Sequence, residues 1–294
     1  MRLMDKFDRP VSMLAWGYNE EELVESFLGR AFALLDKTVT DWELVFVDDG
    51  STDRTGEILA DYARREPRLR VITHETNLNV GFACRRAIAE ARKEILFWQT
   101  VDWSYDLTYL RIFLELLKNF DVVQGIRPAP ERLLSHIPVI RSIYRIKSRS
   151  DTFGKAVVSL SNYYLLRLLY GVKFHDFQNI TFYTTALVQS LTLVGKSSFV
   201  NPELLLKAHA RGARFLEVPI RFIPRQAGEA KGTKLRTIIR SVRDVFGNWI
   251  DWGLKLRLER RRGKRSEQIF RVSQPVYLDE EVLEIIIPLF KCYQ

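Results

Sequence analysis

Two adjacent carboxylates follow a segment that reads as a buried strand. Asp48 and Asp49 come directly after residues 42–47, a short apolar run rich in β-branched and aromatic side chains. Gly50 then allows a turn into a helix. In an open parallel α/β sheet the carboxyl ends of the strands face the ligand crevice, so both aspartates could accept hydrogen bonds from a base or a ribose. The alternative is an Asp-containing turn that only closes the loop between strand and helix.

Polar side chains also follow the neighbouring predicted strands. Tyr18 and Glu20 stand after the first strand, Asn77 precedes a helix, and Asp102 follows another buried run. Strand, turn and helix alternate throughout this half of the chain, which predicts a doubly wound α/β sheet. The strands are expected at residues 11–16, 42–47, 69–73, 94–99 and 121–126, with a late strand at 214–220.

The second half of the chain carries further acids and cations. Asp176 and Glu203 are two of these acids. Glu203 also stands in the first turn of a predicted helix, where a carboxylate is favourable without any catalytic role. Arg225 and Lys231 lie in a turn-rich cationic segment. Arginine suits bidentate contacts to phosphate, and lysine supplies a point charge.

The positive charge is concentrated in one segment. The 294-residue chain has a net charge of +9. Residues 231–265 hold twelve Lys or Arg and three Asp or Glu, which accounts for the whole excess. Such a segment indicates an anionic partner, either a membrane surface, a nucleic acid or an acidic protein.

A helix with apolar residues at a helical period is predicted from Leu235, with arginines on its other side and Trp249 and Trp252 near its end. This composition is typical of a helix that lies in a membrane interface, so residues 235–265 are expected to bind an anionic membrane surface. The alternative is a helix packed on the domain with a solvated basic face. Nucleic-acid binding is not expected, because the tryptophans fit a membrane interface better than a base-stacking platform.

Several classes of protein are disfavoured by what the sequence lacks. No stretch is long and apolar enough for a transmembrane helix and the first residues do not resemble a signal peptide, so a cytoplasmic protein, peripheral at the inner face of a membrane, is expected. The two cysteines are far apart, and the four histidines show no zinc-ligand pairing. There is no glycine-rich phosphate loop and no nucleophile elbow, which argues against kinases, P-loop enzymes and serine hydrolases.

Taken together, these segments resemble the family 2 glycosyltransferases, and among them the polyprenyl-phosphate sugar transferases of the dolichol-phosphate mannosyltransferase type. The resemblance covers roughly residues 11–235. The motifs that carry it are residues 18–21, 47–53 and 77–83, Asp102, His175-Asp176, residues 202–208 and 217–220, and the spaced set Arg225, Gly228 and Lys231.

The resemblance implies a GT-A (Rossmann-like) fold, with a mixed, mostly parallel sheet flanked by helices. It also implies residue roles. Nucleotide-sugar binding is expected of Tyr18, Glu20, Asp48, Asp49, Asn77 and Asp102. Phosphate handling and catalysis are expected of Arg127, Asp176, Arg225 and Lys231. Acceptor binding is expected of Gln178 and Glu203.

The sequence departs from the family at the expected metal motif, Asp-x-Asp. Here it is Thr100-Val101-Asp102, so the first carboxylate is absent. Asp102 could still hold Mg²⁺ or Mn²⁺, because one or two carboxylates suffice when phosphates and water complete the shell. The loss of one negative charge also motivates a catalytically degenerate nucleotide-binding scaffold as an alternative. Two further positions depart from the family pattern. Ala230 stands where the motif of Arg225, Gly228 and Lys231 usually has a serine, and Trp16-Gly17 stands where Pro-Ala is common.

The resulting hypothesis is an inverting glycosyltransferase that moves a sugar from a nucleoside diphosphate sugar to a polyprenyl phosphate at the cytosolic face of a membrane. The alternative acceptor is a glycan hydroxyl in cell-surface polysaccharide synthesis, which would require Asp176 to remove a proton. We expect a GT-A domain over residues 8–235 and a basic amphipathic helical tail over 236–294. Oligomerisation is compatible with this reading.

Overall fold

The computed structural model describes residues 6–126, 153–220, 223, 235–261 and 269–271. Its centre is an eight-stranded sheet in the order β3-β2-β1-β4-β6-β5-β7-β8. The strands are β1 (Val11–Gly17), β2 (Trp42–Asp48), β3 (Leu69–Thr73), β4 (Ile95–Trp98), β5 (Val122–Ile126), β6 (Thr181–Thr184), β7 (Phe215–Pro219) and β8 (Ile269–Arg271). Only β6 runs antiparallel to its neighbours, β4 and β5. The predicted mixed, mostly parallel sheet is therefore confirmed.

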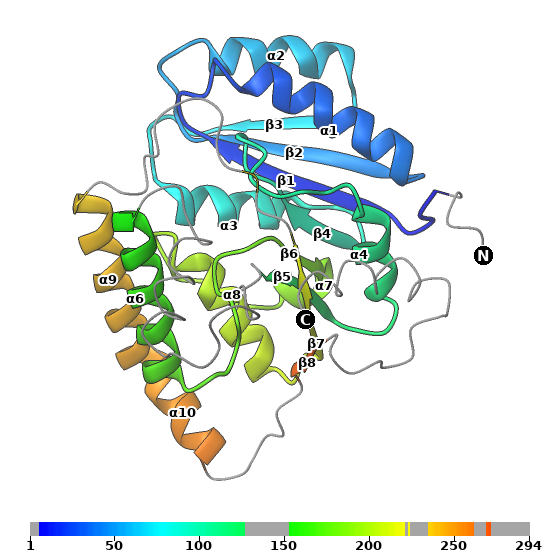
Figure 1. Ribbon diagram of the computed structural model, residues 1–294. Coiled ribbons are helices and arrows are strands. Elements are labelled where there is room, and N and C mark those ends of the chain that lie inside the picture. Colours follow the sequence, from blue (N-terminus) through cyan, green and yellow to red (C-terminus); the bar gives the residue numbers. More distant parts are fainter. Residues whose placement is uncertain (1–5, 127–152, 221–222, 224–234, 262–268, 272–294) are drawn as a thin grey trace.

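Helices cover both faces of this sheet (Figure 1). The described helices are α1 (Val24–Thr38), α2 (Thr55–Arg65), α3 (Val80–Glu90), α4 (Leu110–Leu116), α6 (Phe153–Tyr170), α7 (Thr185–Gln189), α8 (Val200–Ala210), α9 (Leu235–Asn248), the π-helix η2 (Trp249–Gly253) and α10 (Leu254–Arg261). None of these helices is long and apolar enough to cross a bilayer.

The alternation of side chains along the strands builds two cores. On β1, Met13 and Ala15 point to the layer formed by α1, α2 and α4. Leu14 points to the opposite layer, which contains α3, α6 and α8. Successive strand residues face opposite sides of a sheet, and in a sheet covered by helices both sides are apolar. This explains why residues 42–47 form an uninterrupted apolar run.

The sequence missed β6 and β8 but placed the other strands to within one or two residues. β6 has only four residues and is followed at once by α7, so it offers no isolated periodic run. Asn19 lies in the loop between β1 and α1, which begins only at Val24.

Helix α9 packs on the domain with one side and exposes apolar residues on another. Val245 is buried, and its carbonyl accepts a hydrogen bond from the Tyr170 hydroxyl. The Trp249 indole donates to the Leu169 carbonyl, and Trp252 packs against Tyr170. The expectation that both tryptophans face a membrane interface is therefore wrong, because their polar N–H groups are used inside the protein. The boundary after residue 235 stays a prediction, and residues 224–234 lie outside the described part of the chain.

Candidate functional site

Unusual backbone conformations gather where β1, β2 and β4 end. The three described non-glycine residues with positive φ lie here, Asn19 at 53°, Asn79 at 78° and Trp103 at 54°, together with Gly50 at 74°. Outside glycine such angles are uncommon, and they are concentrated at functional sites when the surrounding structure enforces them. All four residues stand in the loops that leave β1, β2 and β4 or enter α3, at the edge where parallel α/β sheets bind ligands.

The loops after β1 and β2 hold each other in place. The Asn19 N–H donates to the Ser51 hydroxyl at 2.9 Å, and the Asn19 amide oxygen accepts the Thr52 N–H at 2.8 Å. The Glu20 N–H donates to the Thr55 hydroxyl at 2.8 Å. These reciprocal bonds fix the conformation of one loop through the other, so this part of the edge is rigid before any ligand binds.

Asp53 completes this connection and also opens α2. Partial burial raises the pKa of Asp53, but hydrogen bonds from the Thr55 hydroxyl and from the N–H groups of Thr55 and Glu21 outweigh it, and the net pKa lies below its usual value. In return, the Glu21 carboxylate accepts the Arg54 N–H. Glu21 is therefore part of the loop framework.

The two aspartates that follow β2 are buried and already hydrogen-bonded. Asp48 is 2% exposed and Asp49 is 4% exposed. Asp48 accepts the Ser51 N–H at 3.0 Å, which is the turn-closing contact considered above as the alternative. Asp49 accepts the N–H groups of Leu78 and Asn79 at 3.0 and 2.8 Å. Both carboxylates thus shape the loops of this edge, and direct nucleoside recognition by them stays a prediction.

The other residues predicted to bind the nucleotide sugar border the same loops. Tyr18 and Glu20 are half-buried beside the Ser51 turn, and Asn77 is exposed. A Cβ at Gly50 would lie 2.8 Å from the Asn77 main-chain nitrogen, which shows how closely the β2 turn approaches the loop before α3. The structure therefore brings these predicted residues to one edge of the sheet, around the Asp48 and Asp49 carboxylates.

The turn after β4 carries the residue expected to bind a metal ion. The Thr100 hydroxyl accepts the Ser104 N–H, and the Asp102 carboxylate accepts the Ser104 hydroxyl at 2.6 Å. The described residues contain no group of three or more His, Cys, Asp or Glu side chains suited to a metal ion. One carboxylate fits a Mg²⁺ or Mn²⁺ ion that takes its other ligands from a nucleotide diphosphate and water. It does not fit an ion held by the protein alone.

The antiparallel strand β6 brings a second segment to this edge. Because β6 starts beside the carboxyl ends of β4 and β5, residues 175–180 lie next to the Asp102 turn, and the Tyr105 hydroxyl donates to the Gln178 carbonyl. Asp176 is 2% exposed, and its carboxylate accepts the N–H groups of Phe177 and Gln178. His175 contacts the fully buried Glu217 carboxylate at 2.6 Å.

The Glu203 carboxylate holds a neighbouring loop. Its carboxylate is fully buried and accepts the N–H groups of Val194 and Gly195, at 3.0 and 2.7 Å, and the Lys207 ammonium at 2.5 Å. These contacts hold the loop between α7 and α8. A role for Glu203 in acceptor binding therefore stays a prediction, and the contacts favour a structural role.

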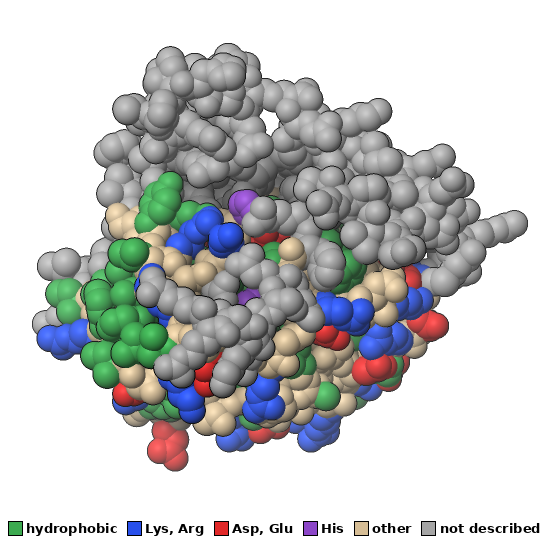
Figure 2. Space-filling model, turned by 90° about the horizontal axis from the view of Figure 1, so that it is seen from below, with side chains coloured by type: hydrophobic (Ala, Val, Ile, Leu, Met, Phe, Trp, Pro, Cys, Tyr) green, Lys and Arg blue, Asp and Glu red, His purple; other side chains and the backbone are tan. Residues whose placement is uncertain are grey.

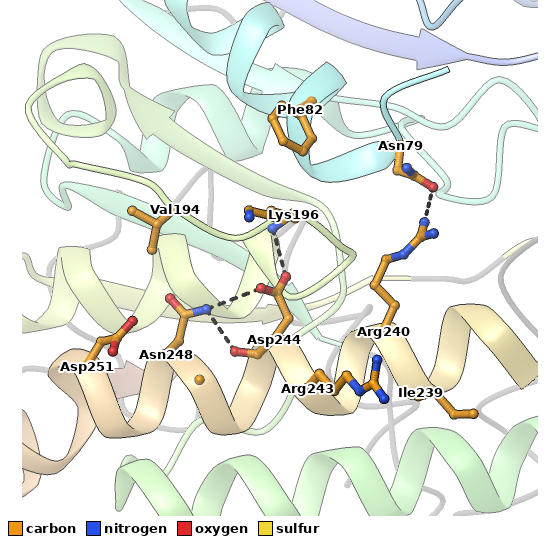
Figure 3. A pocket seen from close by; sticks show the side chains of 11 residues that line it. Asn79, Phe82, Val194, Lys196, Ile239, Arg240, Arg243, Asp244, Asn248 and Asp251 are labelled. Atoms are coloured by element: carbon orange, nitrogen blue, oxygen red, sulfur yellow. Dashed lines mark hydrogen bonds between the residues drawn. The ribbon is translucent and has the colours of Figure 1, made fainter. Parts of the chain in front are cut away.

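Asp244 of α9 continues this pattern along the same loop (Figure 3). It accepts the N–H groups of Lys196 and Ser197 at 2.7 and 2.8 Å, and the Ser197 hydroxyl at 2.8 Å. Four consecutive N–H groups, from residue 194 to residue 197, are thus held by two carboxylates from α8 and α9. Helix α9 is joined to the domain at this point.

The predicted phosphate-handling residues Arg127, Arg225 and Lys231 lie outside the described residues. Asn79 belongs to the motif of residues 77–83 but was assigned no role from the sequence; its N–H binds Asp49 and its side-chain oxygen accepts a hydrogen bond from Arg240. An Asn directly before a helix that contains Gly at its second position was the available signal, because Asn tolerates positive φ. Asp244 gave no comparable signal, since its partner loop is 47 residues away in the sequence.

Comparison with known proteins identifies relatives of this chain. The model of glycosyl transferase family 2 matches residues 17–169. The uncharacterized glycosyltransferase EpsJ of Bacillus subtilis is 40% identical over 28% of this chain and 23% of its own length. The undecaprenyl-phosphate mannosyltransferase of Micrococcus luteus is 25% identical over 84% of this chain and 95% of its own length. The chain spans only 23% to 39% of the length of several other curated relatives that it matches.

Solved structures share the fold. Glucosyl-3-phosphoglycerate synthase from Mycobacterium tuberculosis, in complex with Mn²⁺, uridine diphosphate and glucosyl-3-phosphoglycerate, superposes with a TM-score of 0.52. The match covers 81% of this chain and 80% of that chain at 20% sequence identity. At this identity the likeness establishes the fold, and the GT-A fold expected from the sequence is confirmed.

Proposed function

Because the chain belongs to glycosyl transferase family 2, we propose that it transfers a sugar from a nucleoside diphosphate sugar to a polyprenyl phosphate. The observation that carries the proposal is the nearly end-to-end match with the M. luteus relative, whose name gives undecaprenyl phosphate as the acceptor. The rigid edge formed by the loops after β1, β2 and β4 supports it, because a preorganised crevice is what a nucleotide-sugar site requires.

Sugar transfer develops negative charge on the leaving diphosphate, and the site must stabilise that anion. We assign the Asp102 carboxylate to hold a divalent ion, which when bound would neutralise the diphosphate. Arg225 and Lys231 are proposed as the protein's own cations for the same charge, on the basis of their motif. Tyr18, Glu20 and Asn77 border the Asp48–Asp49 turn and are proposed to contact the nucleotide sugar.

A polyprenyl phosphate acceptor is already an anion at neutral pH, so sugar transfer to it needs no strong general base. This agrees with the state of Asp176, which is buried and accepts two main-chain hydrogen bonds. We therefore propose that Asp176 positions its loop when the acceptor is a lipid phosphate. A glycan hydroxyl would instead require a base, and Asp176→Asn would then abolish turnover while donor binding remains.

The donor and the metal dependence are tested by calorimetric titration with UDP, GDP and their sugar conjugates, with and without Mn²⁺. The expected result is metal-dependent binding of one nucleotide by the parent, strongly weakened in Asp102→Ala. Asp106→Ala removes the same charge from the same loop and should bind normally. No binding of any nucleotide would contradict the proposal and the nucleotide-binding scaffold alike, and would leave a protein whose function lies in its basic tail. Thr100→Asp tests the degenerate alternative, which predicts turnover only in that variant.

We further propose that residues 235–265 bind an anionic membrane surface and so hold the protein at the inner face of a membrane. The outward side of α9, η2 and α10 exposes a row of large apolar side chains, Ile239, Val242, Phe246, Ile250, Leu254 and Leu258. Figure 2 shows hydrophobic side chains gathered at this end of the molecule. Exposed apolar rows of this kind, beside Lys and Arg, are typical of interfacial helices.

Vesicle flotation tests this membrane contact. The parent should float with vesicles that contain anionic lipid and should be weakly retained on DNA. A Phe246→Ser, Ile250→Ser variant should lose most of its vesicle binding, because about 0.8 kcal/mol is lost per buried methylene withdrawn from the membrane. Both side chains are exposed, so the fold should persist. Equal flotation of parent and variant would contradict the proposal.

A further inference from the structure

An open cavity of about 980 Å³ lies between α3, the loop of residues 194–197 and α9 (Figure 3). Its walls combine cations, two carboxylates and apolar side chains, and its lining includes Phe82, Val194, Lys196, Ile239, Arg240, Arg243, Asp244 and Asp251. Of the described residues assigned above, neither Asp102 of the metal proposal nor the candidate base Asp176 lines it.

The cations of this cavity differ in how they are used. Arg240 donates a hydrogen bond to the Asn79 side chain. For Arg243 and for Lys196, no side-chain hydrogen bond or ion pair is made within the described part of the chain. Two carboxylates, Asp244 and Asp251, also line the cavity, and Asp244 accepts the N–H groups of Lys196 and Ser197. Two cationic groups are thus available to an anion, and the amino end of α3 adds the positive end of its dipole.

The apolar part of the cavity is continuous with the outer side of α9. Ile239 lines the cavity and is 45% exposed, and it is also the first described member of the apolar row that runs to Leu258. Val194, at the other end of the cavity near Asn248 and Asp251, is 41% exposed (Figure 3). A ligand with an anionic head and an apolar chain could therefore place its head between Arg243 and Lys196 while its chain leaves along α9.

The cavity is also connected to the nucleotide edge through one residue. Asn79 lines the cavity and accepts from Arg240, while its own N–H binds the Asp49 carboxylate at 2.8 Å. The head of a ligand in this cavity would lie on the α3 side of the loop that Asp49 holds. Apolar walls with a few placed charges are typical of small-molecule sites.

We propose that this cavity binds the phosphate monoester of a polyprenyl chain, with Arg243 and Lys196 contacting the phosphate and Ile239 contacting the first isoprene units. The inference rests on the proposed function, since it gives the lipid acceptor a site. No bond is made or broken in the cavity itself, and its role is to collect and orient the acceptor.

Binding of farnesyl phosphate, below its micellar concentration and without any nucleotide, tests the inference by calorimetry. The parent should bind farnesyl phosphate more tightly than inorganic phosphate or farnesol. Arg243→Ala and Lys196→Ala should each weaken binding about 10- to 100-fold, as expected for the loss of a charge-assisted hydrogen bond. Ile239→Ser should reduce the preference for farnesyl phosphate over inorganic phosphate. Arg86→Ala removes a charge from α3 outside the cavity and should bind as the parent does.

Two outcomes would overturn the inference. One is a parent that does not bind farnesyl phosphate, and the other is equal affinity in the parent, Arg243→Ala and Lys196→Ala. An assay of sugar transfer to undecaprenyl phosphate in detergent distinguishes a wrong cavity assignment from a wrong proposed function. If the parent transfers sugar and both variants keep the acceptor KM, only the cavity assignment is wrong. If the parent transfers no sugar with any donor, the proposed function is wrong.

Discussion

Replacing Glu203 by alanine is expected to destabilise the whole fold, because this carboxylate is the acceptor for a loop packed against it. The Glu203 side chain is fully buried and accepts the N–H groups of Val194 and Gly195 and the Lys207 ammonium. Alanine removes all three contacts. Gly195 N–H is buried, so no water can take the place of the lost acceptor there.

The magnitude follows from these contacts. A buried N–H without an acceptor costs about 1–3 kcal/mol, and hydrogen bonds to a charged group contribute about 1.5–3 kcal/mol each. The Lys207 side chain is 18% exposed and can be hydrated, so its loss of a partner adds little. We therefore expect Glu203→Ala to lower the free energy of unfolding by about 3–5 kcal/mol, from the Gly195 N–H left without an acceptor and the lost hydrogen bond from Val194.

Thermal unfolding followed by circular dichroism measures this change. At about 2 °C per kcal/mol for a chain of this length, Tm should fall by roughly 6–10 °C. Glu203→Gln keeps one acceptor oxygen and should lose about half as much. Glu57→Ala is the matched control, because Glu57 also stands in the first turn of a helix but its side chain is 78% exposed. An unchanged Tm in Glu203→Ala, together with a raised acceptor KM, would refute the structural role.

Three further results are expected. Gly81→Ala should destabilise the protein by about 1–3 kcal/mol in urea unfolding, because its Cβ would lie 2.4 Å from the main chain of the 194–197 loop. Gly29→Ala is the control: its Cβ would have nothing within 4 Å, so it should stabilise the protein by about 0.5–1 kcal/mol. In a Cys292→Ser background, Cys84 should resist iodoacetamide at pH 8 until the protein unfolds, since burial raises the pKa of its thiol; rapid labelling of the native protein would contradict this. Asp53→Asn should destabilise the protein at neutral pH, and the difference from the parent should shrink as pH falls below about 4. The reason is that the lowered pKa of Asp53 gives stability that is present above its unfolded pKa of about 3.9 and lost as pH falls through the folded value. Urea midpoints from pH 3 to pH 7 measure this, and a pH-independent difference would contradict it.

Most of the sheet could be predicted because its strands are buried on both faces. A continuous apolar run such as residues 42–47 is a local property, and it predicts a strand wherever the run is short and bounded by turn residues. The ends of those strands could be predicted with them, so Tyr18, Asp49 and Asp102 were correctly expected at one edge. Strand β6 could not, because its antiparallel place between β4 and β5 depends on contacts with residues 57 to 89 positions away.

The sequence by itself determined the alternation of strands and helices, the edge where the polar residues gather and the concentration of positive charge in one segment. These depend on the order of side chains along the chain. Only the tertiary structure decided how each carboxylate and indole is used, because a hydrogen bond depends on which donor the fold brings near. In the folded protein, Glu203 and Asp244 both accept N–H groups of the 194–197 loop, and Trp249 and Trp252 use their indole N–H groups inside the protein. The apolar row of α9 stays exposed beside the cavity that Arg243 lines.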